Sequence, residues 1–224
     1  MTITGQDTET SRALRGLEDG DVSVRLRAAL AIGSAPDPRC VGRLVERCAV
    51  EPEFYVRDML TWALTRHPVD LTLPAVLREV RSERAQARSQ ALHTLSKLGD
   101  RSAWPVITRE LLADPDDEVA RSAWRAAVVL VPDDEQGTLA GVLAAQLGRG
   151  GRETQLSLSR ALVDLGDASV PAVDAVARAA DDPDVRAHAL ATRRVLDDPD
   201  TGIGFAIEDA KRVVALDGAP VVDD

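Results

Sequence analysis

Hydrophobic and polar positions along the chain repeat with a period of roughly thirty residues. Each copy contains a turn, often acidic, then a small or apolar residue, a polar residue that is usually arginine, and apolar residues at helical spacing. The aligned polar positions are Arg25, Arg57, Arg88, Arg121, Gln155 and Arg186. The intervals between them are 32, 31, 33, 34 and 31 residues. A period of this length predicts a solenoid built from helix pairs.

Each copy is predicted to hold a helix A, a tight turn and a helix B. The A helices are expected at 8–18, 38–49, 71–82, 102–113, 134–148 and 168–180. The B helices are expected at 21–33, 53–66, 84–98, 116–131, 152–165 and 183–197. The repeats therefore span approximately 8–33, 38–66, 71–98, 102–131, 134–165 and 168–197. A last helix at 203–216 has Ile203, Ile207, Ala210 and Val214 at helical spacing, and it is expected to cap one all-α array over residues 1–224.

The turns carry signals of the same arrangement. Pro74, Pro105 and Pro171 fall near the starts of three A helices, where a missing N–H is tolerated. Acidic turns precede three B helices and can cap their free N–H groups, at 51–53, 114–116 and 182–184. Gly33, Gly99 and Gly166 are expected to end B helices in the left-handed conformation.

Composition narrows the class of protein. Aromatic residues make up only 3% of the chain against 45% hydrophobic residues in all, so small aliphatic side chains must build the core. The sequence shows no apolar leader and no membrane-length apolar run, which predicts a cytoplasmic protein with no membrane partner. Cys40 and Cys48 are eight residues apart on one predicted helix, too far for a disulfide, and are expected to be buried thiols.

Charge is distributed unevenly between the two halves of the chain. The net charge is −10, and residues 1–112 carry 16 Lys and Arg against 15 Asp and Glu, whereas residues 113–224 carry 11 against 22. An acidic C-terminal half repels phosphate, so this distribution disfavours a nucleic-acid partner.

The B helices leave one face free of the predicted core. On a helical wheel the repeat arginine lies beside the buried side, which predicts a structural role for Arg25, Arg57, Arg88, Arg121 and Arg186. The opposite face is centred five residues further on. There the sequence places a candidate partner-binding surface of Arg27, Asp58, Met59, Trp62, Arg66, Gln90, His93 and Lys97. An exposed Trp beside Met and Arg is typical of an interface or a ligand pocket. The alternative is that Trp62 fills a gap between adjacent B helices.

The repeat resembles a known family. The stretch Val24–Gly33 is similar to the B-helix consensus of HEAT repeats, and Asp182–Arg186 is similar to their turn. The resemblance covers nearly the whole chain. It implies a right-handed α-solenoid with B helices lining the concave side, and a scaffold or adaptor role without catalysis. Gln155 departs from the pattern, so the turn before its helix is expected to be held differently.

Candidate chemistry is sparse. His67, His93 and His188 are isolated from one another, and the sequence has no recognisable metal, nucleotide or catalytic motif, so neither a metal nor another cofactor is expected. Gly148–Arg152 is glycine-rich but lacks the Lys-Ser/Thr of a phosphate-binding loop, which indicates an inter-helix linker. Asp58 and Trp62 share a helix face, as in HEAT-like alkylpurine DNA glycosylases, but the acidic C-terminal half argues against that function.

Two binding functions remain open at the sequence level. The leading hypothesis is a scaffold that binds a protein or peptide on the concave B-helix surface. The second follows from residues 54–68 and 82–99, which look similar to bacterial, and especially actinobacterial, HEAT proteins. Some of those are fused to MerR-type regulators. This resemblance implies a sensor domain that binds a small molecule.

Overall fold

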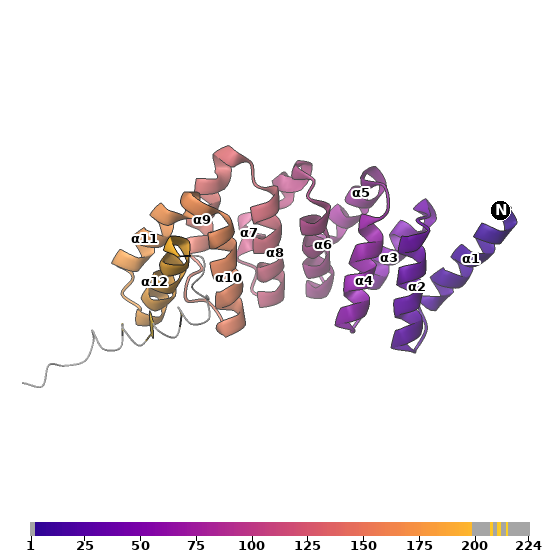
Figure 1. Ribbon diagram of the computed structural model, residues 1–224, viewed down its shortest axis with the longest axis horizontal. Coiled ribbons are helices and arrows are strands. Elements are labelled where there is room, and N and C mark those ends of the chain that lie inside the picture. The colour runs from indigo at the N-terminus through magenta and orange to yellow at the C-terminus, as the bar shows by residue number, and fades with distance from the viewer. Residues whose placement is uncertain (1–2, 199–206, 208–209, 212–213, 215–224) are drawn as a thin grey trace, which may run out of the picture. The chain divides into compact units, whose positions relative to one another are not determined.

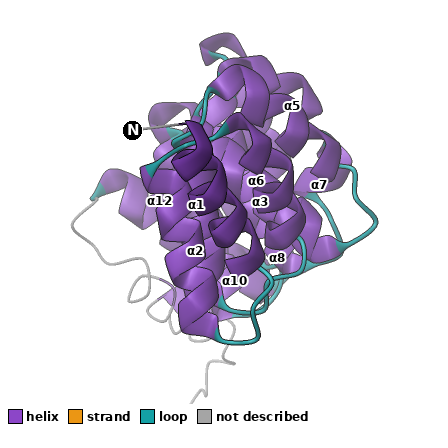
Figure 2. Cartoon of the chain, turned by 90° about the vertical axis from the view of Figure 1, so that its right-hand side faces the viewer, coloured by secondary structure: helices purple, strands orange, loops and turns teal. Residues whose placement is uncertain are grey.

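The computed structural model describes residues 3–198 together with 207, 210, 211 and 214, with the side chains of 3–7 left undescribed. In that part of the chain the regular structure is entirely helical (Figures 1 and 2). The chain divides into two compact units, Met1–Ile107 and Thr108–Asp224. In each unit, successive helix pairs stack in chain order, as expected of a solenoid-type all-α fold.

Unit 1 contains three helix pairs. The A helices are α1 (Ile3–Gly16), α3 (Val41–Cys48) and α5 (Val69–Glu79). The B helices are α2 (Val22–Ser34), α4 (Phe54–Thr65) and α6 (Ala85–Leu98). The 3₁₀ turns are η1 (Pro38–Cys40) and η2 (Arg101–Val106). Helix α4 packs between α2 and α6, and each B helix also packs on its own A helix (Figure 1).

Unit 2 repeats this plan. Its A helices are α7 (Arg109–Leu112), α9 (Gln136–Ala144) and α11 (Val170–Ala179), and its B helices are α8 (Asp117–Leu130), α10 (Arg152–Asp164) and α12 (Pro183–Asp197). The 3₁₀ turns are η3 (Asp133–Glu135) and η4 (Gly166–Ser169). Helix α10 packs against both α8 and α12.

The far end of unit 2 is covered by part of the segment for which the sequence predicts a cap. Ile207, Ala210 and Val214 are buried in one cluster with apolar residues of α12. Lys211 is also helical, and the remaining residues of the predicted cap helix, including Ile203, lie outside the described residues.

The B helices lie within about two residues of their predicted bounds, whereas the A helices differ more. Helix α1 starts at Ile3 instead of residue 8, and α9 ends at Ala144 instead of residue 148. The predicted helix at 102–113 is interrupted, since η2 ends at Val106 and α7 starts only at Arg109. Pro105 cannot donate a helical hydrogen bond, and Thr108 starts a new helix by accepting the Leu111 N–H. Pro74 also differs from expectation, because it lies inside α5 instead of near its start.

The predicted caps are observed in part. The carboxylates of Asp21, Asp116 and Asp182 each accept two backbone N–H bonds at the start of a B helix. Gly99 ends α6 with a left-handed φ of 65°, as expected. Gly33 was expected to be such a cap and is instead helical. A Cβ there would lie 2.3 Å from Cζ3 of Trp62, so the glycine allows α2 and α4 to approach closely.

In unit 1 the repeat arginine serves as a clamp for the turn in front of its helix. Nη1 of Arg25 donates to the carbonyls five and six residues earlier, those of Gly20 and Asp19. Arg57 makes the same pair of bonds to Pro52 and Glu51. Arg88 repeats it with Ser82 and Glu83. These bonds satisfy carbonyls that the sharp turn leaves without helical partners.

Glu51 extends the clamp from one repeat to the next. Its side chain is fully buried, and it accepts two bonds from Arg25, at 2.8 and 2.9 Å, and a 2.7 Å bond from Arg47. Arg47 donates a second bond at 2.9 Å, and the Glu53 backbone N–H adds a fifth contact at 2.9 Å. Burial alone would raise the pKa of Glu51, yet these hydrogen bonds lower it to about 2. The carboxylate is therefore charged, and its interactions join the first two repeats.

We expect the substitution Arg25→Ala to destabilise unit 1 by about 3 kcal/mol, because it leaves the buried Glu51 carboxylate with fewer donors. Arg43→Ala is the control. Arg43 forms exposed ion pairs with Glu18 and Glu46, so its loss should cost less than about 1 kcal/mol. Urea unfolding monitored by circular dichroism measures both changes. Equal losses of stability in the two variants would contradict the proposed importance of the clamp.

Candidate functional site

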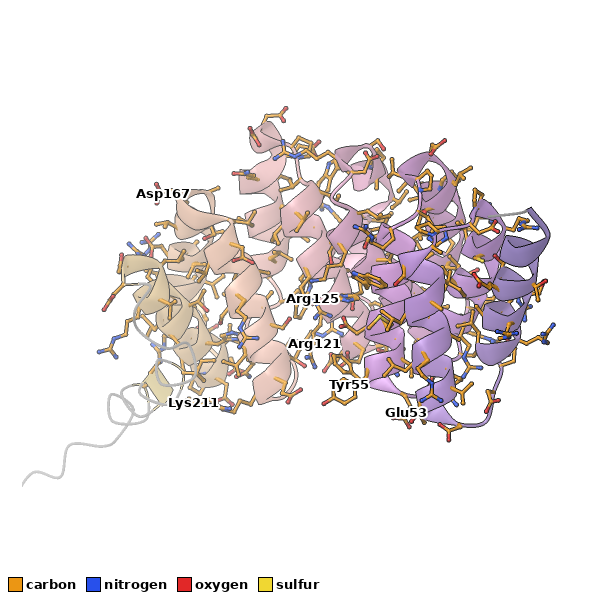
Figure 3. The ribbon with its side chains drawn as sticks, turned by 45° about the vertical axis from the view of Figure 1, so that its right-hand side comes forward. Glu53, Tyr55, Arg121, Arg125, Asp167 and Lys211 are labelled. Carbon is orange, nitrogen blue, oxygen red and sulfur yellow. The ribbon has the colours of Figure 1, made fainter. Side chains whose placement is uncertain are left out.

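The exposed face of α4 carries a line of large side chains. Tyr55, Met59, Trp62 and Arg66 follow one another at spacings of four, three and four residues, which places them on one side of the helix. Tyr55 is 75% exposed and Trp62 is 37% exposed, while Met59 is half-buried. Figure 3 shows Tyr55 projecting from the ribbon near Glu53, at the start of α4. These four residues are called the α4 surface below.

Trp62 is partly packed and partly free. One edge of its indole lies against Gly33 and the backbone of α2, so it does fill part of the space between two B helices. More than a third of the residue is nevertheless accessible. The two interpretations of Trp62 from the sequence therefore describe different edges of the same ring. Contact with α2 holds the ring in place while the other edge faces outward.

The sequence analysis missed two residues of this region, Phe54 and Tyr55. Their rings meet edge to face with centroids 5.6 Å apart, and Phe54 is 63% exposed. The guanidinium carbon of Arg57 lies 6.0 Å from the centre of the Phe54 ring. The helical-wheel prediction covered the positions that follow Arg57, and Tyr55 lies two residues before Arg57. Tyr55 lies seven residues before Trp62, and this spacing is the signal that would have found it.

Other predicted residues lie on the neighbouring B helices or beside the α4 surface. Asp58, Arg66 and Lys97 are exposed, and His93 is half-buried on α6. Leu30 of α2 occupies the same repeat position as Trp62 and is 45% exposed. Since α2 and α6 pack on either side of α4, these groups extend the α4 surface in both directions. Arg66 and Lys97 make this part of unit 1 basic.

Gln90 and Arg27 do not belong to the surface in the way that the sequence suggested. Gln90 lines a narrow internal space with residues of α3 and α5, and its side-chain oxygen is buried with no hydrogen-bond donor among the described residues. Arg27 is exposed, and it lines a groove between α1 and α2. The helical wheel treated all B helices alike, whereas α6 turns its Gln90 side inward and α2 borders α1.

Comparison with solved structures supports the fold. Kap121p bound to Pho4p matches all of this chain and 27% of its own, with a TM-score of 0.61 and 18% sequence identity. The chain thus spans about a quarter of Kap121p. The CpcE–CpcF complex of the phycocyanin lyase from Nostoc sp. PCC7120 matches 96% of this chain and 90% of its own, with a TM-score of 0.50 and 16% identity. The fold is a HEAT-like helical repeat.

Sequence comparison adds no nearer relative. No family model and no curated protein matches the chain. At identities below a fifth, the two structural neighbours support the fold alone. Inference about the function of this HEAT-like protein therefore depends on its own side chains.

The two side chains that most resemble a catalytic pair, His188 and Ser159, are buried in unit 2. His188 Nε2 lies 2.9 Å from Ser159 Oγ and 3.1 Å from the Gln155 carbonyl, while its Nδ1 accepts the Gly148 N–H at 3.0 Å. Ser159 Oγ also contacts Thr192 Oγ1 at 2.8 Å. All three side chains are fully buried, so substrate cannot reach them. This network joins α10 to α12 and to the turn before α10.

The described residues offer neither a metal site nor a membrane helix. Among them, no group of three or more His, Cys, Asp or Glu is placed to hold a metal ion. None of the helices in the described part of the chain is both long and apolar enough to cross a membrane. Cys40 and Cys48 are free and buried, and burial raises the pKa of Cys48 to about 12.

The His188 network predicts a loss of stability in mild acid. Burial lowers the pKa of His188 from 6.5 to about 4, and Nδ1 already accepts a hydrogen bond, so the folded state holds the imidazole neutral. Between pH 6.5 and about 4 the unfolded state binds more protons than the folded state, and stability falls as the pH falls. From pH 7 to pH 5 the decrease should be about 2 kcal/mol.

Urea unfolding at both pH values measures this decrease. His188→Gln is the control, because its amide can donate to the Gln155 carbonyl but does not titrate. This variant is expected to lose stability at pH 7 and to show a flatter dependence on pH between 7 and 5. The same pH dependence in wild type and variant would exclude His188 as its source.

Proposed function

We propose that this protein is a non-enzymatic interaction module that binds a segment of a partner protein on the α4 surface. The observation that carries the proposal is the position of its aromatic residues. The whole chain has six of them, and Phe54, Tyr55 and Trp62 all lie exposed on one helix. A sequence that builds its core from Ala, Val and Leu has no packing requirement for exposed rings on α4.

The chemistry of these side chains suits a protein partner. Tyr and Trp combine a large apolar area with a polar group, and together with Met and Arg they are enriched in the energetically important part of interfaces. Trp62 is held in place by α2, so its binding costs little side-chain entropy. The α4 surface is an exposed helix face, and a face of this kind is better suited to a polypeptide than to a small molecule.

The charges define the partner further. Arg66 and Lys97 are exposed cations near the apolar centre, and Asp58 is an exposed anion beside it. A segment with one large apolar residue to pack on Tyr55, Met59 and Trp62, flanked by acidic residues for Arg66 and Lys97, would match this pattern. The solenoid Kap121p, which shares the fold, has been solved bound to Pho4p, a precedent for a protein partner on such a fold.

The test compares three tagged proteins recovered from the source cells, namely wild type, Tyr55→Ser and Leu71→Ser. Tyr55 is 75% exposed, so its loss should not disturb folding, and Leu71 is an apolar residue on α5 that is 43% exposed. We expect a partner that co-purifies with wild type and Leu71→Ser and is depleted with Tyr55→Ser, measured by quantitative mass spectrometry.

The purified partner then gives the affinity. Calorimetry should show that Tyr55→Ser and Trp62→Ala each weaken binding about tenfold or more, equivalent to at least about 1.4 kcal/mol. Melting curves of the free variants separate lost contact from lost folding. A partner recovered equally with all three proteins would place the binding site elsewhere and refute the proposal for the α4 surface.

A further inference from the structure

A second surface of unit 1 lies at the start of the array, away from α4. A groove of about 390 Å³ opens between α1 and α2. Its walls are mainly apolar, and its rim carries three charged residues, Glu9, Arg12 and Arg27. The groove narrows where a Cβ on Gly16 would lie 2.9 Å from Ala28 Cβ, which marks the close crossing of the two helices. From that crossing α1 diverges from α2 toward its own start (Figure 1).

The contacts between successive B helices define two sides of each B helix. A downstream side faces the next B helix and includes the positions four and eight residues after the repeat position. An upstream side faces the preceding B helix. It includes the position one residue before the repeat position and the positions three, six and ten residues after the repeat position. Gly33, on the downstream side of α2, meets Ala63 on the upstream side of α4. Ser159 of α10 meets Thr192 of α12 in the same relation.

The upstream side is closed on α4 and α10, which each follow another B helix within their unit. On α4 this side consists of Val56, Leu60 and Ala63, all of them completely buried. On α10 the equivalent residues Thr154, Leu158 and Ala161 are also buried. The repeat therefore uses the upstream side of a B helix to receive another helix.

The upstream side of α2 is open along half of its length. Val24 is half-buried and Ala28 is buried near the crossing with α1, whereas Ala31 and Ala35 are exposed. All four residues line the groove, together with Ala13 of α1. The groove thus occupies the position at which the repeat elsewhere places a B helix.

We propose that this groove binds an α-helix of a partner protein in the manner of a preceding B helix. The groove lining on this side runs from Val24 to Ala35, about 16 Å or three helical turns, and its half from Ala31 onward is open. Small alanine side chains line it, so a second helix can approach closely. The partner helix is therefore expected to present small residues at i, i+4 and i+7 toward the groove.

The rim sets the expected charge of that helix. Arg12 and Arg27 are exposed and border the groove, and Glu9 is the one acidic residue of its described lining. A helix with acidic residues flanking its small-residue face would complement the two arginines. The groove is distinct from the α4 surface, since its lining includes Arg27 and Ala31 of α2 but not Leu30.

The probe for the test is a fluorescein-labelled, hydrocarbon-stapled peptide of residues 21–35 that carries Arg25→Glu and Arg27→Glu. Its Ala29 and Gly33 reproduce the downstream face that the repeat already uses, Arg25→Glu supplies an acidic flank to that face, and Arg27→Glu removes a positive charge from the peptide. Fluorescence anisotropy with the full chain should show saturable binding in the micromolar range. Ala31→Glu in the protein should weaken that binding about tenfold or more.

Leu30→Glu is the matched control, because Leu30 is the adjacent residue of α2 and is also exposed, but lies outside the groove lining. It should bind the peptide like wild type, and both variants should keep the wild-type melting temperature. Absence of binding to wild type, or an equal loss in both variants, would overturn the proposal. A wild-type dimer in light scattering that Ala31→Glu dissociates would also overturn it, since the occupant would then be a second copy of this chain.

Discussion

The backbone carbonyls in the turns between helices A and B impose the constraint on which this fold depends. A sharp turn leaves several carbonyls without helical donors, and a short, alanine-rich helix pair has little burial energy to offset unpaired groups. Arg25, Arg57 and Arg88 solve the problem in the same way, each through two bonds to carbonyls five and six residues earlier. In the first of these turns the Arg25 guanidinium also binds Glu51, and this ion pair connects the turn to the next repeat.

Unit 2 meets the same constraint with different residues. Arg121 pairs with Glu118 and Glu153, and its Nε is buried without an acceptor among the described residues. Arg149 binds Asp117 and the Asp114 carbonyl, and its guanidinium lies 5.9 Å from the centre of the Trp124 ring. Gln155, shorter than arginine, reaches the Gly148 and Gly150 carbonyls at 3.4 Å. The turn of the fifth repeat is therefore held by different side-chain contacts, as the absence of the repeat arginine predicted.

The presence of Gln155 in place of the repeat arginine is accompanied by a glycine-rich turn before α10. Gly148 and Gly150 have φ values of 86° and 67°, and a Cβ at either position would come within 3 Å of a neighbouring side chain. The turn must pass close to Val185 and Asp117 so that Arg149 can reach back to the preceding turn. The glycines thus serve packing and backbone conformation, consistent with a linker.

The sequence predicted the fold well because its signals are local and repeated. Helical spacing and capping acids located the B helices, whose bounds depend on neighbours within a few residues. The prediction of one continuous A helix at 102–113 was wrong. Pro105 and Thr108 interrupt the helix there, although the apolar residues of this short span have helical spacing. Gln90 was misplaced for another reason, since the rotation of α6 about its axis depends on α3 and α5. Tyr55 was missed because the helical wheel was counted forward from Arg57. Its seven-residue spacing from Trp62 is nevertheless visible in the sequence.

Small side chains account for both the core and the exposed surfaces. Close-packed alanines, and the glycine at position 33, allow helices to approach closely and leave little room for rings inside. Among the described residues, Trp124 is a fully buried ring, and its Nε1–H has an acceptor in the Leu112 carbonyl. The aromatic residues at the start of α4 cannot be explained by the same need, because Phe54 and Tyr55 are exposed and fill no buried space. A core of this composition thus makes exposed rings more informative about function than they would be in a protein rich in aromatic residues.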